Sequence, residues 1–261
     1  MKIELSYNYT VIVPVLYVVA TPIGNLEDIT LRALRVLGEV DLIAAEDTRT
    51  ARKLLNKYNI NTRVTSYYEH NKMVKMPQLL KVLEERDIAL ISEAGMPGIS
   101  DPGFELIKGA IQKGIGVEVI PGASSLTAAL VISGLPADQF VFLGFLPRKK
   151  GERRNLFLSV INEPRTILCF ESPHRLVDTL GIMLEILGDR NVAICRELTK
   201  MHQEVFRGSL TGAIKHFSKP RGEFTIVIQG TGDTKKYLHK IKHKQKSKRG
   251  DTVCNTDFAG V

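Results

Sequence analysis

Tryptophan is absent from the sequence, and cysteine is scarce, with three among 261 residues. The cysteines stand at positions 169, 195 and 254, too far apart for a metal-ligand motif or a disulfide framework. Cys169 and Cys195 lie inside apolar runs, where we expect buried and reduced thiols. Reduced thiols are typical of cytoplasmic proteins, and we predict that location.

The short signatures of several common enzyme classes are missing as well. Neither G-x-x-x-x-G-K-[ST] nor G-x-G-x-x-G occurs, which excludes a nucleotide P-loop and a Rossmann dinucleotide fingerprint. The G-x-S-x-G elbow of α/β-hydrolases and the H-E-x-x-H helix of zinc enzymes are absent too. We therefore predict a ligand site that uses none of these signatures and no metal ion.

Long hydrophobic runs are rare. Residues 11–20 are apolar and have the character of a signal-peptide core, but Pro14 interrupts the run. No other segment approaches the length of a membrane span, so we predict no membrane association. A buried first strand over 15–20 is the better interpretation, with residues 1–14 as an N-terminal extension.

Positive charge is concentrated at one end of the chain. The formal net charge is +8, and residues 232–261 carry eight lysines and arginines against three aspartates. This basic tail is too polar to bury a core, and we expect it to be disordered. Two roles stay open for it, namely a solubilising end or an electrostatic hold on phosphates.

The rest of the chain alternates short apolar runs with amphipathic segments, which is the pattern of a parallel α/β fold. Strands are predicted at 15–20, 40–45, 88–92, 117–120, 140–146, 165–171, 191–197 and 223–229. Helices are predicted at 29–38, 48–58, 77–86, 103–113, 124–133, 151–162, 174–187 and 209–217. The length fits two α/β domains, which we place at residues 15–122 and 123–231.

Two glycine-rich loops are the strongest sign of a ligand site. Residues 92–103 and 121–125 each follow a predicted strand and together hold four glycines and three prolines. Glycine permits positive φ and a close approach of the backbone to a ligand, while proline stiffens the same turns. Because ligands bind at the carboxyl ends of strands in open α/β sheets, the two loops predict one pocket with two walls.

Polar residues gather at two further strand ends in the first half. In residues 46–49, a helix cap explains Asp47 or Thr48 and leaves Arg49 without a structural role. Residues 67–72 offer hydrogen-bonding and stacking groups that suit a base or ribose, although spacing alone favours an ordinary surface loop.

The second half has two such ends. Ser172 followed by Pro173 predicts a helix start, which leaves the charged residues of 171–175 unexplained. For residues 196–200, an internal pair of Arg196 with Glu197 is the structural alternative to a functional role.

Eight segments together resemble the ribosomal RNA small subunit methyltransferase I family, within the tetrapyrrole-methylase superfamily of S-adenosylmethionine-dependent enzymes. They follow one another in family order, at 17–26, 45–49, 68–71, 94–103, 119–125, 170–175, 196–200 and 222–228. The sequence departs from the family pattern at five positions, which are Lys72, Glu93, Met96, Gly98 and Gln203. Lys72 stands where the family commonly has glutamate.

The resemblance implies two α/β domains of the tetrapyrrole-methylase type, with the cofactor cleft between them, and a homodimer. It also implies 2′-O-methylation of a cytidine ribose in the decoding region of small-subunit (16S) rRNA, as free rRNA or in the 30S subunit. Carried over by position, it implies cofactor binding at Pro22, Ala94, Gly95, Met96, Ile99, Ser124, Ser125, Phe170 and Gly208. Substrate contacts are expected from Arg49, His70, Asn71, Arg175, Arg196 and Lys200.

A ribose hydroxyl is a poor nucleophile, so a general base would help by roughly 10²–10⁴-fold. Glu171, His174 and Glu197 are the candidates, and the sequence does not choose among them. Two alternatives stay open: another methyltransferase of the superfamily with a tetrapyrrole substrate, and a ribosome-binding protein without catalysis.

Overall fold

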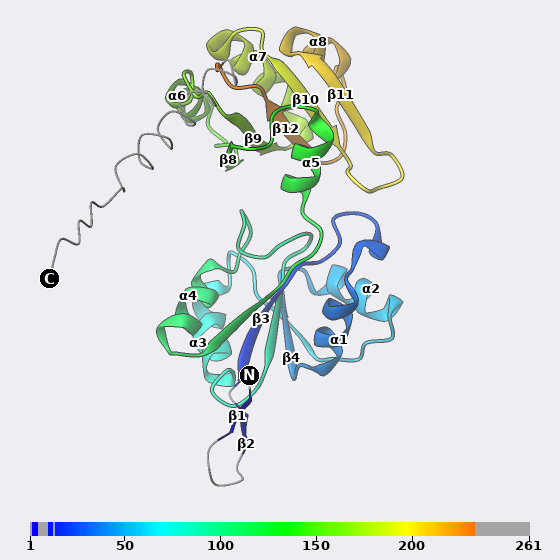
Figure 1. Ribbon diagram of the computed structural model, residues 1–261, viewed down its shortest axis with the longest axis vertical. Helices are drawn as coiled ribbons and strands as arrows, with labels where there is room; N and C mark the ends of the chain where they lie inside the picture. The colour runs from blue at the N-terminus through cyan, green and yellow to red at the C-terminus, as the bar shows by residue number, and fades with distance from the viewer. Residues whose placement is uncertain (1, 5–9, 13, 233–261) are drawn as a thin grey trace, which may run out of the picture. The chain divides into compact units, whose positions relative to one another are not determined.

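The computed structural model describes residues 2–4, 10–12 and 14–232 of the chain (Figure 1). Its contacts divide the protein into two units. The first runs to Ile132 and also takes in Cys195–Val205 and Gly222–Thr225, while the second holds Ser133–Ile194, Phe206–Arg221 and the residues from Ile226 onward. The division falls after Ile132, ten residues beyond the domain boundary that we predict from the sequence.

The first unit is built on a parallel sheet of five strands. Their order is β5-β4-β6-β3-β7, and all the pairs are parallel. The strands are β3 (Val15–Val19), β4 (Leu42–Ala45), β5 (Val64–Ser66), β6 (Ile88–Ile91) and β7 (Gly116–Ile120). The helices between them are α1 (Leu31–Glu39), α2 (Thr48–Lys57), α3 (Lys72–Val82) and α4 (Phe104–Gln112), with α5 (Ser125–Ser133) after β7. In Figure 1, α1 and α2 cover one face of this sheet and α3 and α4 cover the other.

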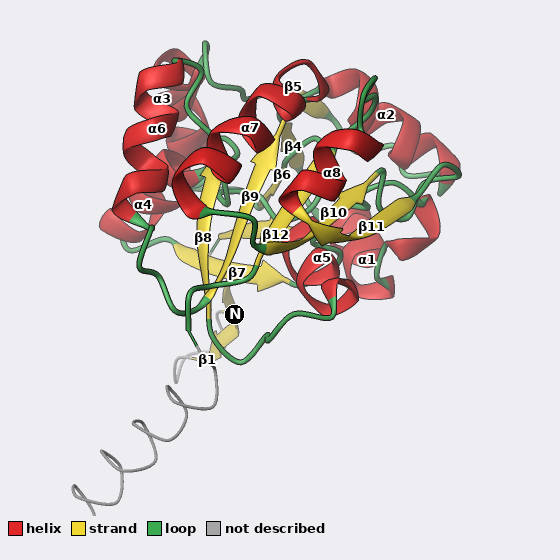
Figure 2. Ribbon diagram, turned by 90° about the horizontal axis from the view of Figure 1, so that it is seen from above, coloured by secondary structure: helices red, strands yellow, loops and turns green. Residues whose placement is uncertain are grey.

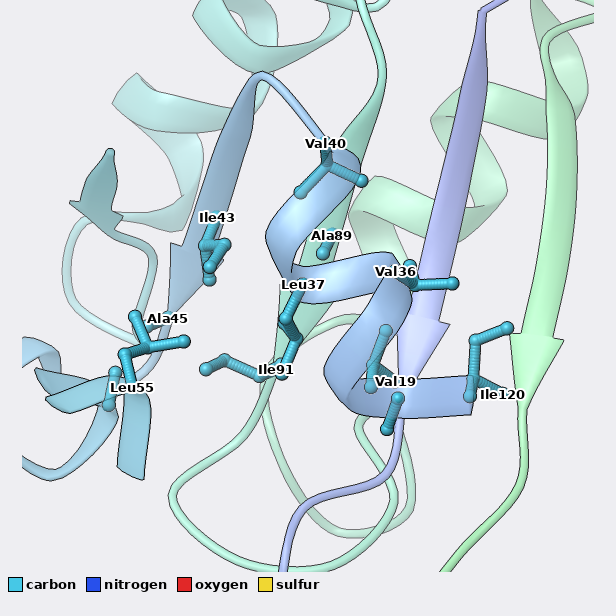
Figure 3. Close-up of a cluster of buried hydrophobic side chains, with 12 residues drawn as sticks. Val19, Val36, Leu37, Val40, Ile43, Ala45, Leu55, Ala89, Ile91 and Ile120 are labelled. Atoms are coloured by element: carbon cyan, nitrogen blue, oxygen red, sulfur yellow. The ribbon is translucent and has the colours of Figure 1, made fainter. Parts of the chain in front are cut away.

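Four of the five strands of this sheet are mainly apolar because both faces of the sheet are covered. In β4, Ile43 and Ala45 join the cluster under α1 and α2, whereas Ala44 joins the cluster under α3 and α4. Figure 3 shows Val36 and Leu37 of α1 packed over the first of these faces. Burial on both faces is the reason that parallel strands have continuous apolar sequences, and it explains why the sequence predicts four of the five strands.

The strand order creates a topological switch point between β3 and β6. From β3 the chain crosses to β4 on one side, and from β6 it crosses to β7 on the other side. The loops at the carboxyl ends of β3 and β6 therefore leave in opposite directions. In open α/β sheets, ligands bind in the crevice that such diverging loops create.

The second sheet has the order β11-β10-β12-β9-β8, with β8 and β9 parallel. Its strands are β8 (Phe140–Phe145), β9 (Thr166–Glu171), β10 (Asn191–Arg196), β11 (Glu204–Ser209) and β12 (Phe224–Ile228). The helices are α6 (Lys150–Ser159), α7 (Leu176–Leu187) and α8 (Leu210–His216), and α7 contacts both of its neighbours (Figure 2). A short two-stranded antiparallel sheet joins β1 (Lys2–Glu4) to β2 (Thr10–Ile12), inside the segment that we predict as an extension.

The α/β fold class is confirmed, and among the strands and helices of the two five-stranded sheets three differ from the sequence prediction. β5 is missed because it is three residues long and largely polar, and β11 is missed because charged and small residues interrupt its apolar pattern. α3 starts at Lys72 rather than at 77 and continues through Pro77. Cys169 and Cys195 are buried, as predicted, whereas residues 233–261, including Cys254 and nearly all of the basic tail, lie outside the described residues. None of the described helices is long and apolar enough to span a membrane.

Candidate functional site

The switch point of the first sheet is closed by a bridge between the loops after β3 and β6. The backbone N–H of Thr21 donates to the carbonyl oxygen of Gly95 at 2.9 Å, and the N–H of Gly95 donates back to the carbonyl of Thr21 at 3.0 Å. A Cβ atom on Gly95 would lie 3.8 Å from the carbonyl oxygen of Ala123. The two glycine loops that the sequence singles out therefore lie side by side at this edge.

The shape of the loop over 92–103 depends on residues with positive φ. Gly95 and Gly98 have φ of 80° and 82°, and Ser100, which is not glycine, has φ of 64°. Gly103 packs so closely that an added Cβ would lie 3.2 Å from the nitrogen of Gly98. The loop is compact, and a side chain at any of these glycines would be strained or would clash with its neighbours. This is expected for a loop that holds a defined shape.

The hydroxyl of Thr21 is a buried polar group without a hydrogen-bond partner among the described residues. Thr21 is only 4% exposed, and its backbone is paired with Gly95 at the switch point. Leaving such a hydroxyl unpaired costs about 1–3 kcal/mol, so a bound polar molecule at this place is a natural partner. The residues present fit a small ligand with amino, carboxyl or hydroxyl groups.

Two carboxyl groups in and beside this loop have raised pKa values. Glu46, directly after β4, accepts a hydrogen bond from the backbone N–H of Glu93 at 3.2 Å. Burial and the nearby Glu46 carboxylate raise the pKa of Asp101 to about 7, against the lowering effect of Ser92. Burial also raises the pKa of Glu46. No local pattern in the sequence singles out Thr21 or Asp101, because the importance of both residues depends on which strands are neighbours.

Among the predicted substrate residues at the edge of the first sheet, some already make hydrogen bonds within the protein and others are exposed. Asp47 caps α2 by accepting from the backbone N–H of Arg49 at 2.7 Å, so the capping interpretation of Asp47 is confirmed. The side chain of Arg49 is exposed, and so is His70, whose ring lies 6.3 Å from that of Tyr68. Asn71 accepts from the N–H of Tyr68 at 2.8 Å and donates to Ser66, so it organises the loop after β5.

The segment 196–200 belongs to the first unit and is strongly cross-linked. Glu197 accepts from the N–H of Glu223 at 2.9 Å and from the ammonium of Lys200 at 3.1 Å. Burial alone would raise the pKa of Glu197, but these two donors hold it below its ordinary value. Arg196 pairs with Glu204 at 3.2 Å, and its charge is also one of the causes that lower the pKa of Glu197.

The same segment packs against residues just after β3. The N–H of Asn25 donates to the hydroxyl of Thr199 at 3.0 Å. A Cβ on Gly24 would lie 2.5 Å from Cγ of Lys200, so only glycine fits there. Thr199 has a positive φ of 63°, a strained conformation that the surrounding contacts impose. Lys200 is therefore held in place on both sides.

In the second unit, Glu171 is enclosed at the end of β9. Its side chain has no exposed surface and accepts from the N–H of Ser172 and the hydroxyl of Thr179, both at 2.7 Å. It also pairs with Arg175 at 2.5 Å. Arg175 donates in addition to the carbonyl oxygens of Leu146 and Pro147, at 3.2 and 3.0 Å. Glu171 thus anchors Arg175 to the loop after β8.

The helix start predicted from Ser172-Pro173 is confirmed. A short 3-10 helix over Pro173–Arg175 leads into α7, with Ser172 at its N-cap. The side chain of His174 is exposed, which leaves it accessible to a ligand.

The predicted cofactor residues fall on both units. The first unit holds Pro22, next to Thr21, and Ala94, Gly95, Met96 and Ile99 on the loop after β6. Ser125 begins α5, beyond β7, and Ser124 directly precedes it. In the second unit, Phe170 packs against Phe142 and Phe145 with ring centroids 5.0 and 5.2 Å apart, and Gly208 lies in β11. Within the described ranges, no three His, Cys, Asp or Glu side chains gather as metal ligands would.

Comparison with known proteins establishes the class to which this chain belongs. The chain matches the family described as Tetrapyrrole (Corrin/Porphyrin) Methylases over residues 15–213. The solved structure of diphthine synthase covers 82% of this chain and 89% of its own, with a TM-score of 0.66 and 16% identity. Uroporphyrin-III-C-methyltransferase from Thermus thermophilus covers 82% and 93%, with a TM-score of 0.55 and 20% identity. The fold is that of the tetrapyrrole methylases.

Closer relatives narrow the assignment. A Thermotoga maritima protein named ribosomal RNA small subunit methyltransferase I is 52% identical over 82% of this chain and 98% of its own. The protein of the same name from Halalkalibacterium halodurans is 51% identical over 89% and 82%, and that from Bacillus subtilis is 43% identical over 89% and 81%. The chain therefore belongs to the ribosomal RNA small subunit methyltransferase I family.

Proposed function

We propose that this protein methylates small-subunit rRNA, transferring a methyl group from S-adenosylmethionine to the 2′-hydroxyl of a cytidine ribose in the decoding region. The observation that carries the proposal is the identity of about half the residues, over most of the chain, with proteins named for rRNA methylation. Free rRNA or the 30S subunit is the substrate, and the enzyme works as a cytoplasmic homodimer.

The switch point supports the use of S-adenosylmethionine. This cofactor carries amino, carboxyl and ribose hydroxyl groups, any of which can satisfy the buried hydroxyl of Thr21. Its sulfonium supplies an activated methyl group when it is bound. In the loop residues Ala94–Met96, the absence of a side chain on Gly95 permits a ligand to approach the backbone closely, while the polar backbone groups of Gly95 itself are paired with Thr21. The remaining cofactor contacts implied by the resemblance, including Phe170 and Gly208, stay part of this proposal.

We propose one proton acceptor in addition to those that the sequence suggests. In the reaction, the ribose oxygen forms a bond to the methyl carbon while the carbon–sulfur bond breaks, and the hydroxyl proton passes to a base. Glu171 is enclosed by its donors, and Glu197 is held as a carboxylate of lowered basicity. Asp101 is half-buried at the switch point, with a pKa of about 7 that suits a general base. We add Asp101 to the candidates and keep His174, which is exposed.

Methyl transfer to RNA tests the proposal directly. The purified protein is incubated with methyl-labelled S-adenosylmethionine and small-subunit rRNA, or 30S subunits, that lack the modification. We expect label in a nuclease-resistant 2′-O-methylcytidine within the decoding region. As a matched control, the same RNA with a 2′-O-methyl group already on that cytidine accepts no label.

Three results would contradict it. Label on a base, or turnover of a precorrin-type substrate in place of RNA, would favour another activity of the superfamily. If calorimetry detects no binding of S-adenosylmethionine, the protein is a ribosome-binding relative without catalysis.

A further inference from the structure

Two aromatic side chains stand exposed at the same edge of the first sheet. Tyr68, in the loop after β5, is 39% exposed, and Phe104, the first residue of α4, is 62% exposed. β5 and β6, whose loops carry them, are separated in the sheet by β4 alone. We call Tyr68 and Phe104 the aromatic pair.

Two ion pairs that share Lys72 link the two backbone segments. The ammonium of Lys72 lies 2.8 Å from the carboxylate of Glu69 and 2.6 Å from that of Glu105. Glu69 directly follows Tyr68, and Glu105 directly follows Phe104, so one ammonium links the two neighbours of the aromatic pair. Only 18% of the Lys72 side chain is exposed, and the hydrogen bonds to Glu105 and Glu69 raise its pKa, so it stays charged.

The exposure of Phe104 is imposed by the start of α4. The close packing of Gly103 against Gly98 sets where the helix begins. Leu106 and Ala110 then face the core, so Phe104 lies on the outer face of the helix with Lys108 one turn further on. The ring is therefore presented to solvent, and the exposed Lys108 follows four residues later on the same helix.

The neighbours of Tyr68 are also suited to a nucleic acid. His70 is exposed and makes an edge-to-face contact with the Tyr68 ring at 6.3 Å. Arg49 is exposed after the adjacent strand β4. Aromatic rings that stack on bases, together with cations that meet phosphates, are what proteins use to hold unpaired RNA.

We propose that Tyr68 and Phe104 stack on unpaired bases of the RNA substrate. Lys72 sets the spacing of the two rings through its ion pairs with Glu69 and Glu105. The inference rests on the proposed function, since it assumes that RNA is the substrate. The inference goes beyond the proposed function because it assigns base contacts to a surface that the family resemblance covers only in part. It also gives Lys72, a departure from the family pattern, a role particular to this chain.

The test measures the affinity of the full-length protein for a short single-stranded RNA from the decoding region by fluorescence anisotropy. Because a base–aromatic stack is worth about 1–3 kcal/mol, we expect Phe104→Ala and Tyr68→Ala each to raise the Kd about 5- to 140-fold. Phe104→Tyr keeps a ring and should retain affinity. Binding of S-adenosylmethionine should stay unchanged in all of them.

A matched control comes from the same helix. Ile111 in α4 is 61% exposed, as open as Phe104, and Ile111→Ala removes apolar surface without removing a ring. It should bind RNA as the wild type does. Lys72→Met removes the ion pairs with Glu69 and Glu105, so we expect weaker RNA binding. Adding Phe104→Ala to Lys72→Met should then cost less RNA affinity than Phe104→Ala costs in the wild type, because the two changes disturb one contact.

The outcomes separate this inference from the proposed function. If the wild type binds and methylates the RNA while Phe104→Ala and Tyr68→Ala bind it equally well, the stacking proposal is wrong and the proposed function stands. If these variants keep RNA affinity and change the sedimentation of the protein, the surface is a protein interface and the proposal is also wrong. A wild type that neither binds nor methylates RNA would overturn both.

Discussion

Replacing Glu171 by glutamine separates a structural role of this residue from a catalytic one. The carboxylate is fully enclosed and receives three interactions, from Ser172, Thr179 and Arg175. Glutamine keeps the volume but removes the charge, and it turns one acceptor oxygen into a donor that faces donors. The Arg175 guanidinium then loses its charged partner while its other hydrogen bonds remain.

The size of the effect follows from the burial of the pair. Removing one partner of a fully buried ion pair costs about 3–5 kcal/mol. Arg175 is a quarter exposed and keeps its bonds to Leu146 and Pro147, so we expect about 2–4 kcal/mol for Glu171→Gln. For a protein of this size that corresponds to a fall in Tm of about 5–15 °C.

Urea and thermal unfolding followed by circular dichroism measure this change. Glu185→Gln is the matched control, because Glu185 pairs with Arg154 on the exposed surface of the same unit. Exposed pairs are screened by water, so this variant should unfold almost as the wild type does. Methyl transfer is measured below the unfolding range for both. If Glu171→Gln is as stable as the wild type and loses kcat, Glu171 acts in the reaction itself and the structural reasoning is refuted.

Three further predictions concern other parts of the chain. Gly222→Ala should lower the free energy of unfolding by about 1–3 kcal/mol, because the new Cβ would lie 2.7 Å from the Glu197 carboxylate at a φ of 91°. The control is Gly38→Ala in α1, whose Cβ meets nothing within 4 Å and should not destabilise the protein. Equal stability of both variants would show that the structure around residue 222 relaxes freely. Since the folded pKa of Asp101 is about 7 and lies above its unfolded value, its contribution to stability is lost as pH rises between about 4 and 7. Asp101→Asn should therefore be more stable than the wild type at pH 8. If the free energies of unfolding of the two proteins change in parallel with pH, the raised pKa of Asp101 is contradicted. Deleting residues 232–261 should weaken RNA binding and flatten its salt dependence while cofactor affinity stays the same, and an unchanged salt slope would mean that the tail does not touch phosphates.

The functional residues show where prediction from the sequence stops. The glycine loop over 92–103 is evident in the sequence because glycine and proline act on the local backbone. The capping role of Asp47 and the helix start at Pro173 are local as well, and both are confirmed. Glu171 and Glu197 look equally reactive in the sequence, because both are charged residues at strand ends. Only their partners, tens of residues away for Glu197, show that they are already engaged.

By itself, the sequence determined the alternation of strands and helices, the α/β fold class and the positions of the two glycine loops. These follow from hydrophobic periodicity and backbone sterics, which act over a few residues. The tertiary structure decided the strand order, and with it the switch point where Thr21 meets Gly95 and where Asp101 lies close to Glu46. It also decided that Lys72 links Glu69 to Glu105. The physical reason is that strand pairing and charge proximity join residues far apart in the chain, which no local pattern records.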